Sequence, residues 1–236
     1  MRKSGEKQRS MERKKKGLLL LSGVIAGALV VLAGACFYYW EELSRAAMIV
    51  GDFLKEHTFL LFATIAVLPA FVVPVFPLLV VAGWWGEIND VWSAWIYTSC
   101  ALIINLTWTY WLASGPGRNL IEKILRRTKY DIPKPDQGDE LLMALILRLV
   151  PGVPFIFTNY ALGLIRMPFW RYFMVSAPIL IVTAGGYVLA VGGALGLTKE
   201  TSSRNLGYFF FGISIILAMI VVGRIVYRKY GSEKQV

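Results

Sequence analysis

Arg148 is the side chain in this sequence best suited to hold an anion within a membrane. It lies in the stretch 146–163, which is otherwise almost wholly apolar. An arginine inside an apolar segment is costly to insert and usually faces a cavity or a partner. Its planar, permanently charged guanidinium favours bidentate binding of phosphate. The alternative is a structural arginine that caps carbonyls of a broken helix or reaches to the membrane interface.

Three further polar residues lie within reach of the same segment. Asn159 follows Arg148 by eleven positions and serves either a head group or the packing of helices through hydrogen bonds. Arg166 and Arg171 flank the segment, where interfacial anchoring explains them as well as head-group binding does. The predicted binding set for a phosphate-bearing head group is therefore Arg148, Asn159, Arg166 and Arg171.

Common enzyme chemistries find no support in the sequence. His57 is the single histidine, so a histidine-based metal cluster or catalytic triad is excluded. Neither a Walker A loop nor a dinucleotide fingerprint occurs. Cys36 and Cys100 both lie in apolar runs and are interpreted as buried small hydrophobes rather than a disulfide or metal pair. We expect a protein that is not an enzyme and that holds no metal and no cofactor.

The composition predicts an all-α polytopic membrane protein. Apolar residues make up 56% of the chain and charged residues only 17%. Several apolar runs approach the ~20 residues that cross a ~30 Å hydrocarbon core. The net charge of +10 would also suit nucleic acid, but the basic residues cluster just outside the apolar runs. We therefore expect membrane lipids with anionic head groups as partners and no nucleic acid. Homo-oligomerisation is left open.

The distribution of basic residues indicates how the apolar runs cross the membrane. Lysines and arginines concentrate before residue 18, in the linker 115–139 and after residue 223, so all three regions should be cytoplasmic. Six full spans would place the linker outside. Two re-entrant hairpins that enter from opposite sides, with about four full spans, satisfy the charges. The hairpins are predicted at 58–85 and 140–165, and the spans at 18–40, 91–114, 169–196 and 206–227.

Prolines and glycines interrupt both predicted hairpins. Proline removes an amide donor and clashes with the preceding helical turn, so it favours a break where a hairpin must turn. Non-helical backbone at membrane depth survives only where protein shields it or where it lines a wet cavity. The two hairpins should therefore meet inside the bundle. The predicted hairpin-forming residues are Pro74, Pro77 and Gly86 in the first, and Pro151, Gly152, Pro154 and Gly163 in the second.

The two halves of the chain repeat one another. When Pro74 is set against Pro151, equal offsets align Pro77 with Pro154, Gly86 with Gly163, Trp92 with Phe169, and Trp95 with Tyr172. An amphipathic stretch precedes each hairpin, at 44–57 and 118–130, and we expect both to form helices in the interface plane. Because the hairpins enter from opposite sides, this is an inverted repeat, an architecture that transporters use to build a site at mid-membrane.

These boundaries define the expected organisation. A basic cytoplasmic tail covers 1–17, and a first span at 18–40 is retained because it is longer than a signal-peptide core and ends in aromatic residues. The core covers 41–200, with repeat one at about 44–114 and repeat two at about 118–196. The last span and a basic cytoplasmic tail cover 201–236.

Two segments resemble the DedA / SNARE-associated Golgi superfamily, also called VTT-domain membrane proteins. They are "PVFPLLVVAGWWG" at 74–86 and "RLVPGVPFIFTNYALGLIRMPFWRYF" at 148–173, and the second is similar to the Tvp-type branch. The resemblance implies opposed re-entrant hairpins and movement of lipids across the bilayer. It implies scrambling in eukaryotic relatives, and recycling of polyprenyl-phosphate carriers or phospholipids in bacterial ones.

We therefore expect a lipid flippase or scramblase in a bacterial inner membrane. The sequence departs from many DedA members, which have a second arginine where Pro154 stands and acids in the first hairpin; 59–85 has no acid. This counts against proton coupling. The alternatives are a secondary transporter of a small ion or solute and a membrane scaffold that transports nothing.

Overall fold

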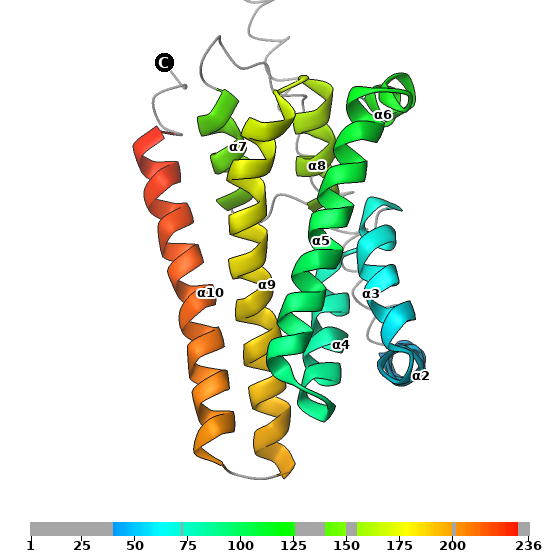
Figure 1. The fold of residues 1–236 in the computed structure, drawn as a ribbon, viewed down its shortest axis with the longest axis vertical. Helices are drawn as coiled ribbons and strands as arrows, with labels where there is room; N and C mark the ends of the chain where they lie inside the picture. The colour runs from blue at the N-terminus through cyan, green and yellow to red at the C-terminus, as the bar shows by residue number, and fades with distance from the viewer. Residues whose placement is uncertain (1–39, 72, 126–139, 150–154, 200–201, 231–236) are drawn as a thin grey trace, which may run out of the picture. The chain divides into compact units, whose positions relative to one another are not determined.

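The computed structural model describes residues 40–71, 73–125, 140–149, 155–199 and 202–230, and every regular element among them is helical. The predicted hairpin residues Pro151, Gly152 and Pro154 lie outside the described residues, as does the predicted span 18–40. The chain divides into two compact units, 1–52 and 53–236. The helix α2 (Trp40–Glu56) covers most of the first predicted amphipathic stretch, and the boundary between the units falls within it. The remaining helices, labelled in Figure 1, all fall within residues 53–236 and so belong to the second unit.

The first predicted hairpin is a pair of short helices that returns to the end where it starts. It consists of α3 (Thr58–Val67), the short 3-10 helix η1 (Leu68–Phe71) and α4 (Val75–Ile88). Pro74 precedes α4, and its fixed φ suits the start of a helix. The Trp85 indole Nε1 donates to Thr58 Oγ1 at 3.0 Å, so the beginning of α3 lies beside the end of α4.

The second predicted hairpin has the same form. The helices α7 (Glu140–Leu149) and α8 (Phe155–Leu164) are each ten residues long, roughly 15 Å, which is half the thickness of a hydrocarbon core. The Glu140 carboxylate lies 3.9 Å from the Arg171 guanidinium at the start of the next helix, α9 (Phe169–Lys199). The chain therefore leaves this pair at the end where it entered.

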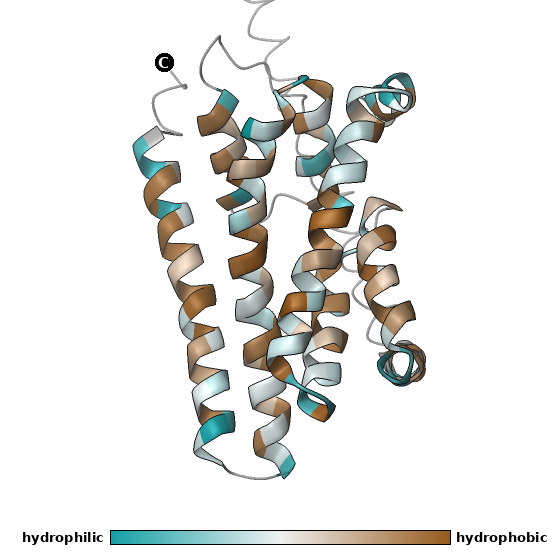
Figure 2. Cartoon of the chain, in the orientation of Figure 1, coloured by the Kyte–Doolittle hydropathy of each residue, from teal (hydrophilic) through white to brown (hydrophobic). Residues whose placement is uncertain are grey.

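Long helices form the body of the unit. They are α5 (Val91–Ser114), α9 and α10 (Ser203–Tyr230), and the short α6 (Arg118–Leu125) follows α5. Both α9 and the Ser203–Val226 part of α10 are long and apolar enough to cross a membrane. The bent pair Met48–Glu56 with Thr58–Phe71 would add a third candidate if it counts as one span. Figure 2 shows apolar residues along the middle of α10 and hydrophilic residues at both of its ends.

The two hairpins open toward opposite ends of the second unit. At one end, the Arg118 guanidinium donates to the Leu164 carbonyl at 2.7 Å, which joins the start of α6 to the end of α8. At the other end, Lys199 Nζ lies 2.8 Å from Glu87 Oε2, which joins the end of α9 to the end of α4. The pair α7–α8 therefore opens at the end of the unit where Arg118 and Leu164 lie. The pair α3–α4 opens at the opposite end, where Glu87 and Lys199 lie (Figure 1).

The two halves pack against one another through their short and long helices. Helix α4 packs against α9, and the corresponding helix α8 packs against α5. Trp95 on α5 donates through Nε1 to the Ile181 carbonyl of α9 at 2.8 Å. Its repeat partner Tyr172 on α9 donates through its hydroxyl to the Leu106 carbonyl of α5 at 3.2 Å. Each half therefore holds the other half's long helix by an aromatic donor.

Glycines allow the half-length helices to approach the long ones closely. A Cβ at Gly163 would lie only 2.7 Å from the Ala113 Cβ on α5, far closer than van der Waals contact. A Cβ at Gly86 would lie 2.7 Å from the Ala94 Cβ near the other end of α5. Both glycines of the repeat are therefore packing positions against the same helix, rather than turn positions of a hairpin.

Candidate functional site

Arg148 lies near the end of α7, and its side chain makes three hydrogen bonds to other side chains of the described residues. Its Nη2 donates to Asn159 Oδ1 on α8 at 2.6 Å, and more weakly to the Tyr172 hydroxyl at 3.3 Å. Its Nε donates to Ser176 Oγ on α9 at 3.1 Å. These direct partners of the guanidinium come from α8 and α9.

All of these acceptors are uncharged. Ion pairs within the described part of the chain join Glu140 to Arg171 and Glu87 to Lys199, and none involves Arg148. The rings of Phe155 and Tyr172 lie near the guanidinium, with centroids 5.6 and 5.7 Å from Cζ. Aromatic faces attract a cation but do not neutralise it. Among the described residues the positive charge of Arg148 thus has hydrogen-bond partners but no counter-ion.

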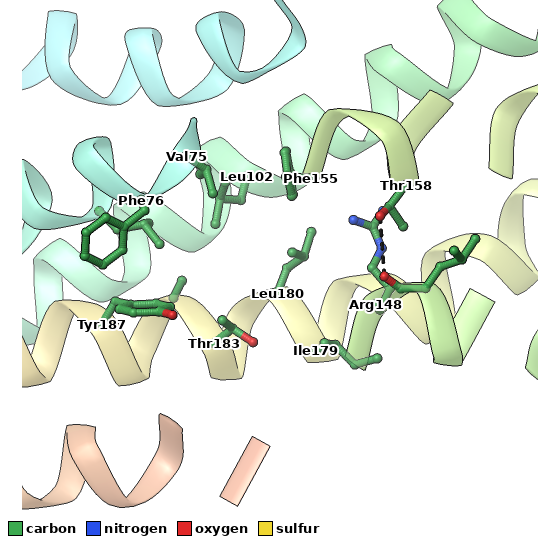
Figure 3. A pocket seen from close by; sticks show the side chains of 13 residues that line it. Val75, Phe76, Leu102, Arg148, Phe155, Thr158, Ile179, Leu180, Thr183 and Tyr187 are labelled. Carbon is green, nitrogen blue, oxygen red and sulfur yellow. Dashed lines mark hydrogen bonds between the residues drawn. The ribbon is translucent and has the colours of Figure 1, made fainter. Parts of the chain in front are cut away.

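A cavity of about 240 Å³ opens beside Arg148. Figure 3 shows Arg148 and Thr158 at one end of it and the rings of Phe76 and Tyr187 at the other. These two rings meet edge to face with centroids 5.5 Å apart. Leu102 of α5 and Leu180 of α9 form part of the walls. The cavity is therefore amphiphilic, with a cation at one end and apolar and aromatic walls elsewhere.

The starts of both half-length helices face this cavity. Val75 and Phe76 are the first two residues of α4, and Phe155 is the first residue of α8; all three line the cavity. The N-terminus of a helix carries a partial positive charge and free amide donors. The breaks in the two hairpins thus bring two helix N-termini to the same space as the guanidinium, which adds to its preference for an anion.

The structure places the four predicted head-group residues in two locations. Arg148 and Asn159 are in direct contact in the interior. Arg166 is exposed in the turn after α8, with a positive φ of 56°. Arg171 is exposed at the start of α9 beside Glu140. The expectation that all four form one group therefore holds for the interior pair only, and the two outer arginines belong to the rim.

Three residues of the interior site were not among the predicted set. Asn105, Tyr172 and Ser176 are fully buried, and each takes part in the hydrogen bonds around Arg148 and Asn159. Tyr172 was noted only as a match in the repeat, and Asn105 lies alone in an apolar span. A polar residue in the middle of an apolar helix is itself a signal for a buried partner. The sequence carries that signal but does not name the partner.

A second, more polar pocket of about 270 Å³ lies at the end of the unit where Glu87 meets Lys199. Asp90 lines it and caps α5, where its Oδ2 accepts from the Ser93 amide at 2.7 Å. These hydrogen bonds from Ser93 lower the pKa of the Asp90 carboxyl below its usual value. Glu87 is not a fully solvated charge, because its side chain is only 10% exposed beneath Lys199.

The described residues contain no group of three or more histidine, cysteine or acidic side chains that could hold a metal ion. What they define is a helical membrane protein with a basic, amphiphilic cavity at the meeting point of two broken helix pairs. Residues 73–193, just over half of the chain, match the family model of the VTT domain. The chain belongs to this family, the DedA/SNARE-associated Golgi family. No curated protein and no solved structure matches it. The Tvp-type branch stays a prediction.

Proposed function

We propose that this protein moves a phosphate-bearing lipid, a phospholipid or a polyprenyl phosphate, across the bilayer as a flippase or scramblase. The observation that carries the proposal is the guanidinium of Arg148, which faces an amphiphilic cavity without a counter-ion among the described residues. A charge held inside a membrane without an internal partner is expensive, and a functional ligand is the usual reason for keeping one.

The shape of the cavity favours a lipid over a small soluble anion. Its volume of about 240 Å³ is below the ~300–1,000 Å³ typical of sites that enclose a whole ligand. It can hold a head group but not acyl or prenyl chains. Phe76 is 54% exposed at the cavity's aromatic end, which suits a chain that stays in the membrane while the phosphate reaches Arg148.

The two short helix pairs supply a path to this cavity. We infer that α3–α4 and α7–α8 are re-entrant hairpins that enter from opposite membrane faces, because each returns to the end where it starts. The starts of α4 and α8 both line the cavity, and irregular backbone at membrane depth is tolerated where it faces a wet space. A head group could then reach Arg148 from either side as the hairpins move.

The orientation follows from the charges at the two ends. The end with Arg118 and Arg171 also receives the end of α10, with Arg228 and Lys229. By the positive-inside rule this end is cytoplasmic, and the same rule, applied to the basic residues of the sequence, makes both chain termini cytoplasmic. The end with Glu87 and Asp90 then faces outward. We place the protein in a bacterial plasma membrane, as a multi-pass protein.

The decisive experiment measures transbilayer movement in vesicles that contain the purified protein. Head-group-labelled phospholipid and labelled polyprenyl phosphate are tested in parallel. Movement of either above that in protein-free vesicles is expected. Lipid distributions equal to protein-free vesicles for both probes would overturn the proposal and leave a scaffold. A flux of ions or solutes that depends on membrane potential, with no lipid movement, would instead indicate a secondary transporter.

Asn159→Asp tests the role of the uncompensated charge. The new carboxylate would lie where Asn159 Oδ1 now accepts from Arg148 at 2.6 Å, and it would give the guanidinium an internal counter-ion. We expect this variant to fold and to lose lipid movement. Asn159→Ser is the matched control, because it removes the same amide without adding charge and should retain more activity. Full activity of the folded Asp variant would contradict the role assigned to the charge.

A further inference from the structure

We propose that Asn105 is a positioning residue whose amide orients Asn159, and through it Arg148, and thereby links the arginine to the broken end of α3. Asn105 does not line the cavity, and it belongs to α5 in the other half of the chain. The linkage stands on hydrogen-bond geometry; only its effect on transport rests on the proposed function.

A continuous line of hydrogen bonds runs between the two hairpins. Asn105 Nδ2 donates to the Ala66 carbonyl of α3 at 2.8 Å. Asn159 Nδ2 donates to Asn105 Oδ1 at 3.1 Å. Arg148 Nη2 donates to Asn159 Oδ1 at 2.6 Å. Two side-chain amides in series thus join a backbone carbonyl of the first hairpin to the guanidinium of the second.

The groups at both ends of this line of hydrogen bonds determine which atom of each amide donates and which atom accepts. A carbonyl can only accept, so Asn105 must present its amino group to Ala66 and its oxygen to Asn159. A guanidinium can only donate, so Asn159 must present its oxygen to Arg148 and its amino group to Asn105. The two requirements agree. Turning either amide over would place donor against donor on one side and acceptor against acceptor on the other.

Burial makes these orientations strict. The exposed fractions of Asn105 and Asn159 are 0% and 1%, so bulk water cannot replace a lost partner. An unsatisfied polar group in such surroundings carries a full desolvation penalty. Without the amide of Asn105, the amino group of Asn159 loses its acceptor, and the orientation of Asn159 toward Arg148 is no longer fixed.

The line ends where the first hairpin breaks. Ala66 lies in the last turn of α3, where carbonyls lack an intrahelical partner, and the Trp108 indole donates to the same oxygen at 2.9 Å. The Tyr160 hydroxyl of α8 donates to the Ala70 carbonyl of η1 at 2.9 Å. Displacement of the first hairpin's tip would therefore disturb the acceptor that holds Arg148.

A double-mutant cycle on the folded, detergent-solubilised protein tests the linkage without any transport assay. The thermal midpoint is measured for Asn105→Leu, Arg148→Lys and the double variant. Residues that do not touch should give additive shifts. We expect the double shift to fall short of the sum, because either change alone breaks the line through Asn159.

Thr98→Val supplies the matched control on the same helix. Thr98 is fully buried on α5, and its hydroxyl has no hydrogen-bond partner among the described residues. Its combination with Arg148→Lys should be additive. If Arg148→Lys does not fold, Asn159→Ser replaces it, because Asn159 accepts from Arg148 and donates to Asn105. Additive shifts in the Asn105 cycle would overturn the proposal and leave Asn105 a packing residue.

Measurements of lipid movement distinguish a failure of this inference from a failure of the proposed function. Asn105→Leu should reduce lipid movement per folded molecule about tenfold, the factor that corresponds to weakening one hydrogen bond to a charged group. If the wild-type protein moves no lipid, the proposed function fails while a non-additive cycle still supports the linkage. If lipid moves normally in the folded Asn105→Leu protein, the positioning role is wrong and the proposed function stands.

Discussion

Substitution of Arg148 distinguishes a head-group ligand from a structural cap. A guanidinium that holds a phosphate in bidentate fashion makes two hydrogen bonds to a charged group, each contributing about 1.5–3 kcal/mol. Arg148→Ala should therefore weaken head-group binding by about 3–6 kcal/mol, or about 10²–10⁴-fold. Arg148→Lys keeps the charge but loses the planar fork, so we expect a loss of about 10–10²-fold.

The same substitution has a smaller, separate effect on stability. Loss of the guanidinium leaves the buried Asn159 Oδ1 and Ser176 Oγ without their donor, at about 1–3 kcal/mol. Removal of a charge that lacks a counter-ion among the described residues offsets part of this. The folded yield of Arg148→Ala should fall moderately, whereas its transport should fall severely.

The assay is lipid movement per folded molecule in reconstituted vesicles, with folded protein quantified by monodisperse elution in detergent. Ser176→Ala is the control, because it removes one acceptor of Arg148 and keeps the charge. It should lose less than tenfold. Normal transport by the Arg148→Ala molecules that do fold would refute the reasoning, and Arg148 would then only cap the structure around α7 and α8.

Four other predictions follow from the described helices. A cysteine at Lys123 should react with impermeant reagents from the cytoplasmic side and one at Glu87 from the opposite side; reversed labelling would invalidate the topology. Asp90→Ala should lower the thermal midpoint by about 2–4 °C near neutral pH through loss of a helix cap. Hydrogen bonds lower the pKa of Asp90 in the folded state below 3.8, so the cap is lost when the pH falls through that lowered pKa. The difference in thermal midpoint between Asp90→Ala and wild type should then vanish. A difference in thermal midpoint that does not depend on pH would contradict the cap. Gly163→Val should reduce the folded yield, because its Cβ would lie 2.7 Å from a methyl group on α5. Gly207→Ala should not reduce the yield, because the space around Gly207 is open. Equal yields of the two variants would refute the packing argument. Among the described residues one guanidinium lines the cavity, so a singly charged phosphodiester should bind there better than a doubly charged phosphomonoester. Competition between short-chain lipids of the two kinds measures this preference. The reverse order of binding would show that the charge argument is wrong.

Much of the helix arrangement could be predicted from local sequence. The basic linkers and Pro74 before α4 indicated the two short helix pairs. The helices α7 and α8 lie within the predicted segment 140–165, and α3 begins where the predicted segment 58–85 begins, but α4 extends beyond that segment to Ile88. These signals depend on residues near in sequence, where proline geometry and charge act directly. The glycines aligned with the hairpins were interpreted as hairpin-forming, but they serve helix contact, which depends on the partner helix and not on local conformation.

The candidate site could be predicted only in part, for a related reason. Arg148 and Asn159 lie on adjacent short helices, so an apolar segment with two polar residues indicated their meeting. Asn105 lies 54 positions before Asn159 in another helix, and its role depends on how α5 packs between the hairpins. Arg171 has a charge as suitable as that of Arg148, yet it lies at the rim beside Glu140. Residue type alone could not separate the two arginines.

The exchanged packing of α4 on α9 and of α8 on α5 has a consequence for biogenesis. When the first half emerges from the ribosome, the face of α4 that will contact α9 and the polar edge of α5 around Asn105 have no covering. These surfaces stay uncovered in the membrane until α8 and α9 are synthesised and inserted, because Asn159 lies 54 positions after Asn105 and Ile181 lies 86 positions after Trp95. An insertase or chaperone that shields polar groups within the bilayer would protect the first half in this interval. A chain cut after α6 would keep those surfaces open permanently and would be a substrate for membrane proteolysis.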